Sequence, residues 1–540
     1  MSVLPKLQEI VSALKAGDSD QALDLAHAAV RAGLEHPFLF RLTGFALERQ
    51  GAWEEAAVFL RRALAASPGD PDLLTVIGSC HARLGRPVEA IGAYRQAIAS
   101  DPGAVEAHNG LAECLAVVGA AEESRAAYER VLALKPDHLE ARAALALLTA
   151  RLGESAVARR HAEAALALDP AHALAGTALA CAAVAERSFA EAEARLQGLA
   201  ARSDLGDTVR GAALSLLGDA LDGQDRPDEA LEAYEAAARA MARAYGPRYA
   251  DAAEVFAERI KLLPEWLAAT EASSWVEAPA AASDPAGPRV HVFLVGFPRS
   301  GTTLLEQVLA AHPQVLSLEE QPTLAEAETA FLCSAEGVRT LAALDGAAAA
   351  DHRARYWRRV RALGVQPAGK VFIDKLPLNA VNLPVIAKLF PEARVLLALR
   401  DPRDVVLSCF RRAFSLNAAT YGMLTLEGAA GLYDSVMAVV EASRARLPLR
   451  LRETRHETLV EEFETEARAL CAFLDLPWDE DLHAFAEKAR GRTITTPSAA
   501  QVRRGLYRTG LEQWRRYAGA LAGVRDRLDP WVETWGYPKD

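Results

Sequence analysis

The chain has 540 residues, of which 51% are hydrophobic and 24% are charged. This length exceeds what a single hydrophobic core organises, so we expect at least two domains, and the composition excludes disordered and collagen-like classes. The formal net charge of −12 is unevenly distributed, because residues 1–288 carry 27 basic and 41 acidic side chains whereas residues 289–540 carry 33 and 31. The acidic first part argues against nucleic acid as a partner.

Targeting and redox signals are weak along the whole sequence. No apolar run approaches the roughly 18 residues that a membrane span requires, and charges interrupt the N-terminus where a signal peptide would be apolar. We therefore expect a cytoplasmic protein without membrane contact. The six cysteines have no CxxC spacing, which favours free thiols in a reducing compartment, and no metal site is expected.

Glycines recur every 34 residues in the first part of the chain, at Gly17, Gly51, Gly85, Gly119 and Gly153. Prolines keep the same spacing at positions 68, 102, 136 and 170. Alanine-rich segments with helical periodicity lie between these marks. The pattern predicts a repeated unit of helix, glycine turn and helix, in which proline ends the second helix.

This repeat resembles the tetratricopeptide repeat (TPR), because Gly85, Ala90, Tyr94, Ala97 and Pro102 match its small, aromatic and proline positions. The resemblance covers roughly residues 3–185 and continues more weakly, so we expect six or seven units. It implies an all-α solenoid whose concave face recruits a peptide or protein. Homodimer formation, or scaffolding of the chain's own enzyme, is the alternative role.

The sequence predicts three regions. Residues 1–270 are expected to form the repeat solenoid, residues 271–288 a linker rich in Ala, Pro, Ser, Asp and Gly, and residues 289–540 a second domain. Strand and helix patterns alternate in the second domain, in the order HVFLVGF, TTLLEQVLAAH, VFIDK, NLPVIAKLF and RVLLALR. This alternation predicts a parallel sheet that is covered by helices.

The segment FLVGFPRSGTTLLEQV has the strand, turn and helix order of a phosphate-binding loop. Gly296 and Gly301 have the spacing of ATP- and GTP-binding loops, but Thr302 and Thr303 stand where those loops place lysine and a Mg²⁺-binding hydroxyl. We expect main-chain N–H groups at the helix N-terminus to bind an anion. The arginine fork of Arg299 and nearby hydroxyls suit a ligand with fewer charges than a triphosphate, and one that needs no metal.

FPRSGTT, together with LLALRDPRDVVLSCFRR at Leu396–Arg412, resembles the two donor signatures of sulfotransferases that use 3'-phosphoadenosine 5'-phosphosulfate (PAPS). The resemblance covers about residues 290–540. It implies an α/β P-loop-like domain with a central parallel sheet, PAPS as the donor and PAP as the product. The loop would hold the 5'-phosphosulfate and the second signature the 3'-phosphate. The implied contacts are Arg299, Ser300, Gly301, Thr302, Thr303, Arg400 and Ser408, with Arg412 one helical turn beyond Ser408.

The segment HPQVLSLEEQ resembles the tyrosylprotein sulfotransferase branch, in which the second of two glutamates is the catalytic base. Glu320 is therefore the expected base, and Glu319 remains the alternative. Arg299 and Lys375 are the expected stabilisers of the leaving group. TPSAAQVRRGLYRTGLEQWRRY resembles the loop that closes over the nucleotide. In that loop Ser498 would assist at the reacting group, and the residues near the nucleotide would be Arg503, Arg504 and Tyr507.

Three departures from the tyrosylprotein branch concern Pro322, His456 and Gln513, which stand where that branch has arginine, tyrosine and lysine. Pro322 in particular puts tyrosine specificity in doubt. The leading hypothesis is a bacterial-type enzyme that sulfates a hydroxyl of a peptide or protein. A glycan or small-molecule sulfotransferase and a non-catalytic interaction protein are the alternatives. A kinase, with Asp374 as its Mg²⁺ ligand, is disfavoured because the loop lysine is missing.

Overall fold

The computed structural model describes residues 3–275, 286–412, 414, 416–490, 505–506 and 510–539. The chain divides into two compact units, Met1–Glu186 and Arg187–Asp540. Within the described residues, no helix is both long enough and apolar enough to cross a membrane.

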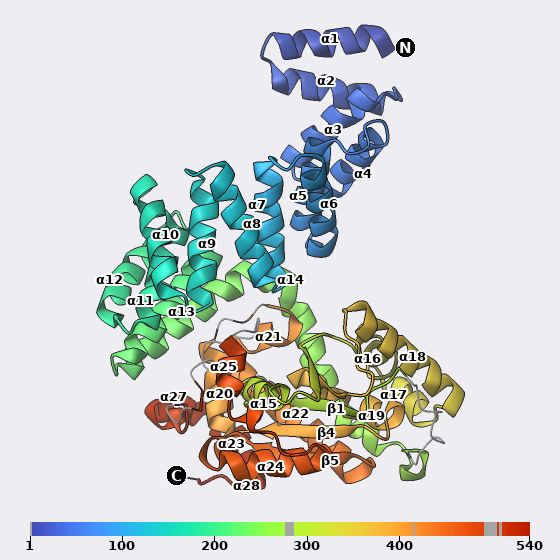
Figure 1. Cartoon of the computed structure of the whole chain (residues 1–540), viewed down its shortest axis with the longest axis vertical. Helices are drawn as coiled ribbons and strands as arrows, with labels where there is room; N and C mark the ends of the chain where they lie inside the picture. Colours follow the sequence, from blue (N-terminus) through green and yellow to red (C-terminus); the bar gives the residue numbers. More distant parts are fainter. Residues whose placement is uncertain are drawn as a thin grey trace. The chain divides into compact units, whose positions relative to one another are not determined.

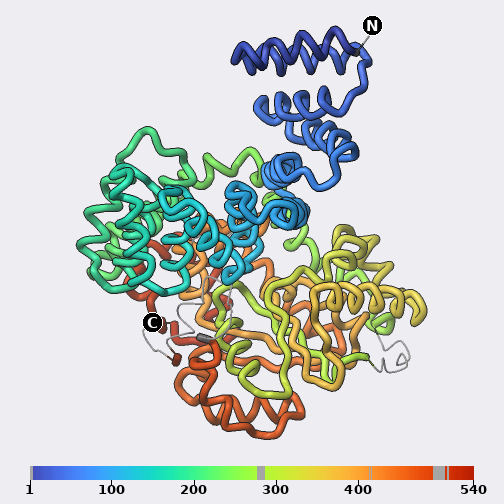
Figure 2. Tube along the Cα trace, turned by 45° about the horizontal axis from the view of Figure 1, so that its top comes forward, coloured from blue at the N-terminus to red at the C-terminus, as the bar shows by residue number. Residues whose placement is uncertain are grey.

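The first unit consists of helices joined by short turns and stacked in chain order, as the blue to teal segments of Figure 2 show. Its helices are α1 (Val3–Lys15), α2 (Ser19–Arg31), α3 (Pro37–Arg49), α4 (Trp53–Leu64), α5 (Pro71–Arg83), α6 (Pro87–Ser100), α7 (Val105–Val117), α8 (Ala121–Leu134), α9 (Leu139–Arg151), α10 (Ser155–Leu168) and α11 (Ala173–Ala185).

The predicted turn glycines lie between the two helices of each of the first five pairs, with φ between 71° and 83°. Glycine adopts this left-handed conformation without steric cost. Arg187, 34 residues after Gly153, takes the same conformation with φ 63°, and Asp225 does so with φ 61°. The repeat therefore continues beyond the last of these five glycines. Residues 3–275, all of them described, hold fourteen α-helices in seven consecutive pairs.

Close helix packing in the first unit depends on small residues facing a large one. Tyr94 of α6 is 4% exposed and lies against Gly78 of α5 and Gly110 of α7. A Cβ atom at Gly110 would lie 2.3 Å from the Tyr94 ring, closer than any real Cβ contact. The tyrosine ring therefore fills the space that the two glycines leave.

The second unit begins with three more helices, continues through a five-stranded sheet and ends in short helical segments (Figure 1). Its strands are β1 (Val290–Gly296), β2 (Val315–Glu319), β3 (Val371–Lys375), β4 (Arg394–Leu399) and β5 (Arg450–Arg455). Its α-helices are α12 (Phe189–Ala200), α13 (Asp207–Gly223), α14 (Pro227–Ala268), α15 (Thr302–Ala310), α16 (Ala325–Phe331), α17 (Ala335–Ala342), α18 (Gly346–Ala362), α19 (Leu383–Leu389), α20 (Pro402–Arg411), α21 (Ala418–Gly422), α22 (Leu426–Arg446), α23 (His456–Glu461), α24 (Phe463–Phe473), α25 (Phe485–Arg490), α27 (Ala518–Leu521) and α28 (Arg525–Thr534). Its 3₁₀ helices are η1 (Ala272–Trp275), η2 (Pro377–Asn382), η3 (Glu480–Leu482), η4 (Gln513–Tyr517) and η5 (Ala522–Val524).

The sheet has the order β2-β3-β1-β4-β5, and all neighbouring strands are parallel. One face packs apolar side chains against α15 and α24, with Val292, Leu294 and Ile373 fully buried. The other face carries an aromatic cluster in which His291 lies 4.7 Å from Trp357, between ring centroids. Burial on both faces explains why the three inner strands, β3, β1 and β4, are mostly apolar along their length.

The predicted fold class, a helical repeat array followed by an α/β domain with a central parallel sheet, is confirmed. Helices α12–α14 belong to the same compact unit as the sheet. The predicted domain boundaries at residues 270 and 288 stay predictions, and most of the expected linker lies outside the described residues.

Gly110→Ala should destabilise the first unit by about 1–3 kcal/mol, because the added methyl group must displace Tyr94. Gly92→Ala is the matched control, since a Cβ there meets nothing within 4 Å on helix α6, and alanine should stabilise that helix by up to about 1 kcal/mol. Chemical unfolding of both variants checks the pair. A Gly110→Ala protein as stable as the Gly92→Ala protein would contradict the packing argument.

Candidate active site

The loops after four strands meet at one edge of the sheet, because parallel strands end on the same side. Lys375, the last residue of β3, lies in register with Leu294 of β1 and with Glu319, the last residue of β2. Gly296, at the end of β1, is in register with Ala398 of β4. The predicted phosphate loop, the glutamate pair, Lys375 and Arg400 are therefore neighbours in space.

The phosphate loop leads directly from β1 into the N-terminus of α15, which begins at Thr302. Gly301 caps this helix with φ 98°, and Arg299 has φ 71°. Ser300, Thr302 and Thr303 are buried, and the buried Ser300 hydroxyl has no hydrogen-bond partner within the described ranges. An unsatisfied hydroxyl beside a helix N-terminus suits an anionic ligand.

The two predicted donor signatures touch each other. The Nε of Arg299 donates to the hydroxyl of Ser408 at 3.0 Å, and Arg400 Nη1 donates to the carbonyl oxygen of Arg299 at 3.3 Å. Cys409 Sγ lies 3.3 Å from the carbonyl oxygen of Pro298, and it packs α20 against the loop. Segments about one hundred residues apart thus form a single cationic surface at the loop.

The buried acid Asp404 contacts Arg400 and is itself held by Trp514. The Arg400 guanidinium lies 3.5 Å from Asp404 Oδ2, and the backbone N–H of Trp514 donates to Asp404 Oδ1 at 2.8 Å. Arg400 also donates to the carbonyl oxygen of Gly510. Burial raises the pKa of Asp404 to about 6, although Arg400 lowers it. Among the described residues, Arg400 Nε has no hydrogen-bond partner, which leaves a donor for a ligand.

His456 packs against the cap of the phosphate loop. A Cβ at Gly301 would lie 2.7 Å from His456 Nδ1, so the loop approaches the imidazole as closely as a glycine permits. Burial lowers the pKa of His456 to about 3, and Arg400 and Arg299 lower it further. The imidazole is therefore neutral at pH 7, and its buried Nδ1 has no hydrogen-bond partner in the part of the chain that the structure describes.

Arg412 lies apart from this cluster. Although it follows Ser408 by one helical turn, its Nη1 donates to Asp219 Oδ2 of helix α13 at 3.1 Å. Its expected role at the 3'-phosphate stays a prediction. Ser498, Arg503, Arg504 and Tyr507 lie outside the described residues.

Lys375 is fully buried and surrounded by three carboxylates. Its Nζ lies 3.0 Å from Glu320 Oε1, 3.2 Å from Glu306 Oε2 and 3.5 Å from Glu319 Oε1. Burial alone would lower the pKa of Lys375, but the three acids together raise it above the ordinary lysine value. The ammonium group is therefore a stable cation beside Glu319 and Glu320, the two candidates for the catalytic base.

Glu320 is the most accessible acid of this cluster, with a side chain that is 36% exposed, compared with 17% for Glu319 and 1% for Glu306. Its backbone has φ 44°, and its N–H donates to the Lys375 carbonyl oxygen at 2.7 Å. Six non-glycine residues in the described part of the chain have positive φ, and two of them are Arg299 and Glu320. Backbone strain of this kind concentrates at functional sites.

Glu306 is the principal residue that sequence reasoning missed. It sits inside the apolar segment TTLLEQVL, and nothing in that pattern indicates that its carboxylate faces a lysine from β3. Burial raises the pKa of Glu306 to about 7, because the attraction of Lys375 only partly offsets the cost of removing a charge from water.

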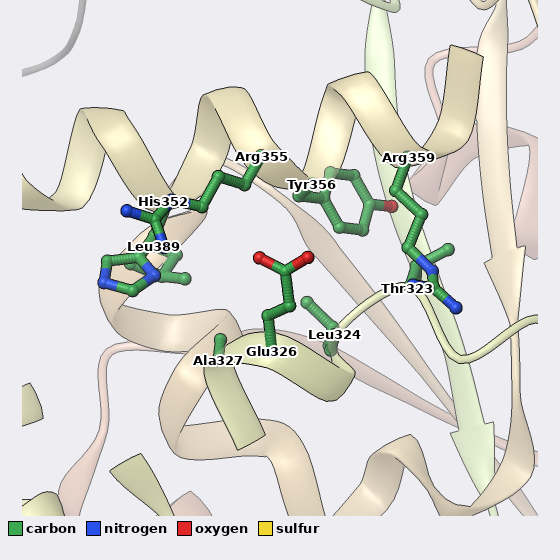
Figure 3. Close-up of a pocket in the computed structure, with 9 residues that line it drawn as sticks. All are labelled: Thr323, Leu324, Glu326, Ala327, His352, Arg355, Tyr356, Arg359 and Leu389. Atoms are coloured by element: carbon green, nitrogen blue, oxygen red, sulfur yellow. The ribbon is translucent and has the colours of Figure 1, made fainter. Parts of the chain in front are cut away.

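A pocket lies on the opposite side of β3, where Asp374 accepts hydrogen bonds from Thr323 at 2.6 Å and from Tyr356 at 2.8 Å. Figure 3 shows Glu326 of α16 facing side chains of α18 across this pocket. The other lining residues are Thr323, Leu324, Ala327, His352, Arg355, Tyr356, Arg359 and Leu389. Since no residue of the phosphate loop lines it, this pocket is separate from the predicted donor site.

Burial raises the pKa of Asp374 to about 6, while the two hydroxyl donors lower it. Both donors hold this acid in the core of the unit and away from the phosphate loop. Among the residues that the structure describes, no group of three His, Cys, Asp or Glu side chains could hold a metal ion.

Comparison with known families assigns both parts of the chain. Residues 291–480 match the model of the sulfotransferase family, and residues 7–71, 77–138 and 177–246 match that of the tetratricopeptide repeat. Residues 291–480 form a sulfotransferase domain. The N-terminal region is a TPR array, so both predicted resemblances are confirmed.

Curated relatives match part of the chain at moderate identity. An uncharacterized protein of Aquifex aeolicus is 28% identical over 261 residues, which cover 45% of this chain and 34% of the relative. The protein-tyrosine sulfotransferase of Drosophila melanogaster is also 28% identical over 261 residues, which cover 46% of this chain and 51% of the relative. The chain thus spans about half or less of the length of these two relatives. A solved tetratricopeptide repeat protein from Parabacteroides merdae is 18% identical, with a TM-score of 0.35, and covers 43% of this chain and 91% of that protein.

Glu306→Gln should flatten the pH dependence of local stability around the sulfotransferase domain's β3. Because the folded-state pKa of Glu306 is raised to about 7, its stabilising contribution is complete below about pH 4.5 and is lost as the pH rises through about 7. Between pH 5 and 8 the wild type should therefore lose about 1–3 kcal/mol more than the variant.

Hydrogen exchange of the β3 peptide, corrected for intrinsic rates, measures this difference. Glu427→Gln, at an exposed position on α22, is the control and should follow the wild-type curve. Parallel pH curves for wild type and Glu306→Gln would show that Glu306 does not titrate in this range.

Proposed function

We propose that this protein transfers a sulfuryl group from PAPS to a hydroxyl acceptor. The observation that carries the proposal is the contact between the two donor signatures, in which Arg299 binds Ser408 and Arg400 binds the Arg299 backbone beside a helix N-terminus. The sulfotransferase-family match and the protein-tyrosine sulfotransferase relatives support it.

The donor site fits a nucleotide with a phosphosulfate better than a triphosphate. Arg299 and Arg400 supply positive charge there, and neutral Thr302 occupies the position where a triphosphate-binding loop has lysine. The buried Ser300 hydroxyl, His456 Nδ1 and Arg400 Nε are polar atoms without partners that a bound anion would satisfy. PAPS would supply the activated sulfuryl group.

The carboxylate–lysine cluster supplies the remaining chemistry. In the proposed reaction a bond forms between sulfur and the acceptor oxygen, the bond from sulfur to the phosphate oxygen breaks, and Glu320 takes the acceptor proton. Lys375 and Arg299 neutralise the charge that develops on the phosphate. Glu320 is preferred over Glu319 because its side chain is more exposed and therefore more accessible to an acceptor.

A peptide or protein is the acceptor class that we favour. The relatives named for protein-tyrosine sulfotransfer support a tyrosine acceptor, and the TPR array supports recruitment of a polypeptide. Pro322, which follows the glutamate pair, departs from that branch and keeps a glycan or small hydroxyl compound as the alternative. A cytoplasmic location and a homodimer are further elements of this proposal.

Titration calorimetry with PAP tests the donor site directly. The wild type should bind PAP without a metal ion and bind it more tightly than Mg-ATP, whereas Arg299→Ala should lose at least about tenfold in affinity, since it removes a charged hydrogen-bond donor. Selective binding would justify an acceptor screen with labelled PAPS. Tighter binding of Mg-ATP, or no PAP binding at all, would overturn the proposal.

The donor and base roles should separate in two variants. Arg400→Ala should weaken PAP binding by tenfold or more, as roughly expected for a lost charged contact, because this guanidinium is part of the donor surface. Glu320→Gln keeps the shape of the site and should leave PAP affinity nearly unchanged while turnover falls by about 10²–10⁴. Equal losses of PAP affinity in the two variants would refute the separation, and unchanged turnover in Glu320→Gln would return the base role to Glu319.

A further inference from the structure

The last turns of helix α13 carry an unusual set of charges. Asp219 and Asp222 lie near its C-terminus, Asp225 follows in the turn, and no basic residue occupies the last turn. Carboxylates at this end of a helix are unfavourable, because the helix dipole already places partial negative charge there. A cluster of this kind requires cations from elsewhere in the structure.

Asp222 obtains these cations from α20 and η4. Its carboxylate accepts hydrogen bonds from Arg411, from Arg516 Nη1 at 2.6 Å and from the Tyr517 hydroxyl at 2.6 Å. The Asp222 side chain is only 15% exposed. Burial would raise the pKa of Asp222, but Arg411, Tyr517 and Arg516 together lower it, so the carboxylate stays ionised at neutral pH.

Neighbouring contacts reinforce the same junction. The Tyr234 hydroxyl of α14 donates to Asp219 Oδ1 at 2.8 Å. The guanidinium of Arg411 lies 5.3 Å from the centroid of the Tyr234 ring and 5.0 Å from that of Tyr517. Arg516 Nη2 also donates to Asp225 Oδ1 at 2.9 Å. The Arg411 guanidinium is thus held between two rings and a carboxylate, with little freedom to move.

The partners of Asp222 belong to the two segments that shape the donor site. Arg411 lies three residues after Ser408 on α20, and Ser408 contacts Arg299 of the phosphate loop. Tyr517 belongs to η4, whose Trp514 N–H binds Asp404, the acid beside Arg400. A single carboxylate on a repeat helix therefore joins both segments.

We propose that Asp222 is a positioning residue for the donor site, and that the last helical pair of the repeat array sets nucleotide affinity by holding α20 and η4 together through it. The inference rests on the proposed function, because it assigns the held residues to donor binding. Asp222 itself touches neither the phosphate loop nor the Glu320–Lys375 cluster among the contacts of the described residues.

Asp222→Asn keeps the side-chain shape and removes the charge, so it should weaken the link between α20 and η4 without opening a cavity, while the Arg412–Asp219 and Arg516–Asp225 pairs remain. We expect the dissociation constant for PAP and the KM for PAPS to rise on the order of tenfold, as for the loss of a charged hydrogen bond. Turnover at saturating PAPS should fall less than about threefold, since β2 and β3 hold the base independently. A general loss of structure would lower turnover and affinity together.

Two further variants complete the design. Tyr517→Phe removes one hydrogen bond to Asp222 and keeps the ion pairs, so it should weaken PAP binding by a smaller factor, about twofold to fivefold. Glu232→Gln changes an exposed acid on α14 that has no ion pair within the described part of the chain, and it should bind PAP like the wild type. Thermal unfolding of each protein accompanies the titration.

The outcomes separate this inference from the proposed function. If the wild type fails to bind PAP, the proposed function fails, and this inference fails with it. If the wild type binds PAP and both Asp222→Asn and Tyr517→Phe bind within twofold of it, Asp222 does not position the donor site, although the function stands. If Asp222→Asn does not fold, Tyr517→Phe decides: weakened binding with unchanged turnover supports the inference, and unchanged binding overturns it.

Discussion

A fully buried ammonium group imposes the main constraint on the sulfotransferase domain. Removing Lys375 from water is costly, and only nearby carboxylates with direct contacts offset that cost. The compensating acids come from the end of β2, the turn after it and the first helix after the phosphate loop. Keeping Lys375 charged therefore requires β2, β3 and α15 to hold their relative positions, and these same elements frame the edge of the sheet where the site lies.

Strain at two backbone positions is the local counterpart of this arrangement. Arg299 and Glu320 both have left-handed backbones, which side chains other than glycine rarely adopt. Arg299 is held by its bond to Ser408 and by Arg400, while the Glu320 N–H is held by the Lys375 carbonyl oxygen. These contacts thus hold Arg299 and Glu320 in backbone conformations that an unconstrained loop would not keep. Contacts within the chain hold both the phosphate loop and the Glu320–Lys375 cluster of the predicted site.

Sequence reasoning succeeded where one short segment carries its own signal. The strand VFIDK is predicted with the same limits that β3 has, because it is an uninterrupted buried apolar run before a charged end. The two edge strands, β5 (RLRETR) and β2 (VLSLE), have no such run and were not predicted. Contacts between distant segments were the hardest features to predict from the sequence. Neither the burial of Glu306 against Lys375 nor the pairing of Arg412 with Asp219 follows from spacing, since each depends on an element far away in the chain.

Helix α14 affects where the repeat helices of this chain could be exchanged for others. It runs through 42 residues, from the turn after α13 to Ala268, and it includes prolines at positions 247 and 264. Since α12–α14 belong to the compact unit that contains the sheet, the boundary between the two compact units lies at residues 186 and 187, between α11 and α12. A graft that exchanges repeats for a different recognition array should therefore leave α12–α14 joined to the unit that contains the sheet.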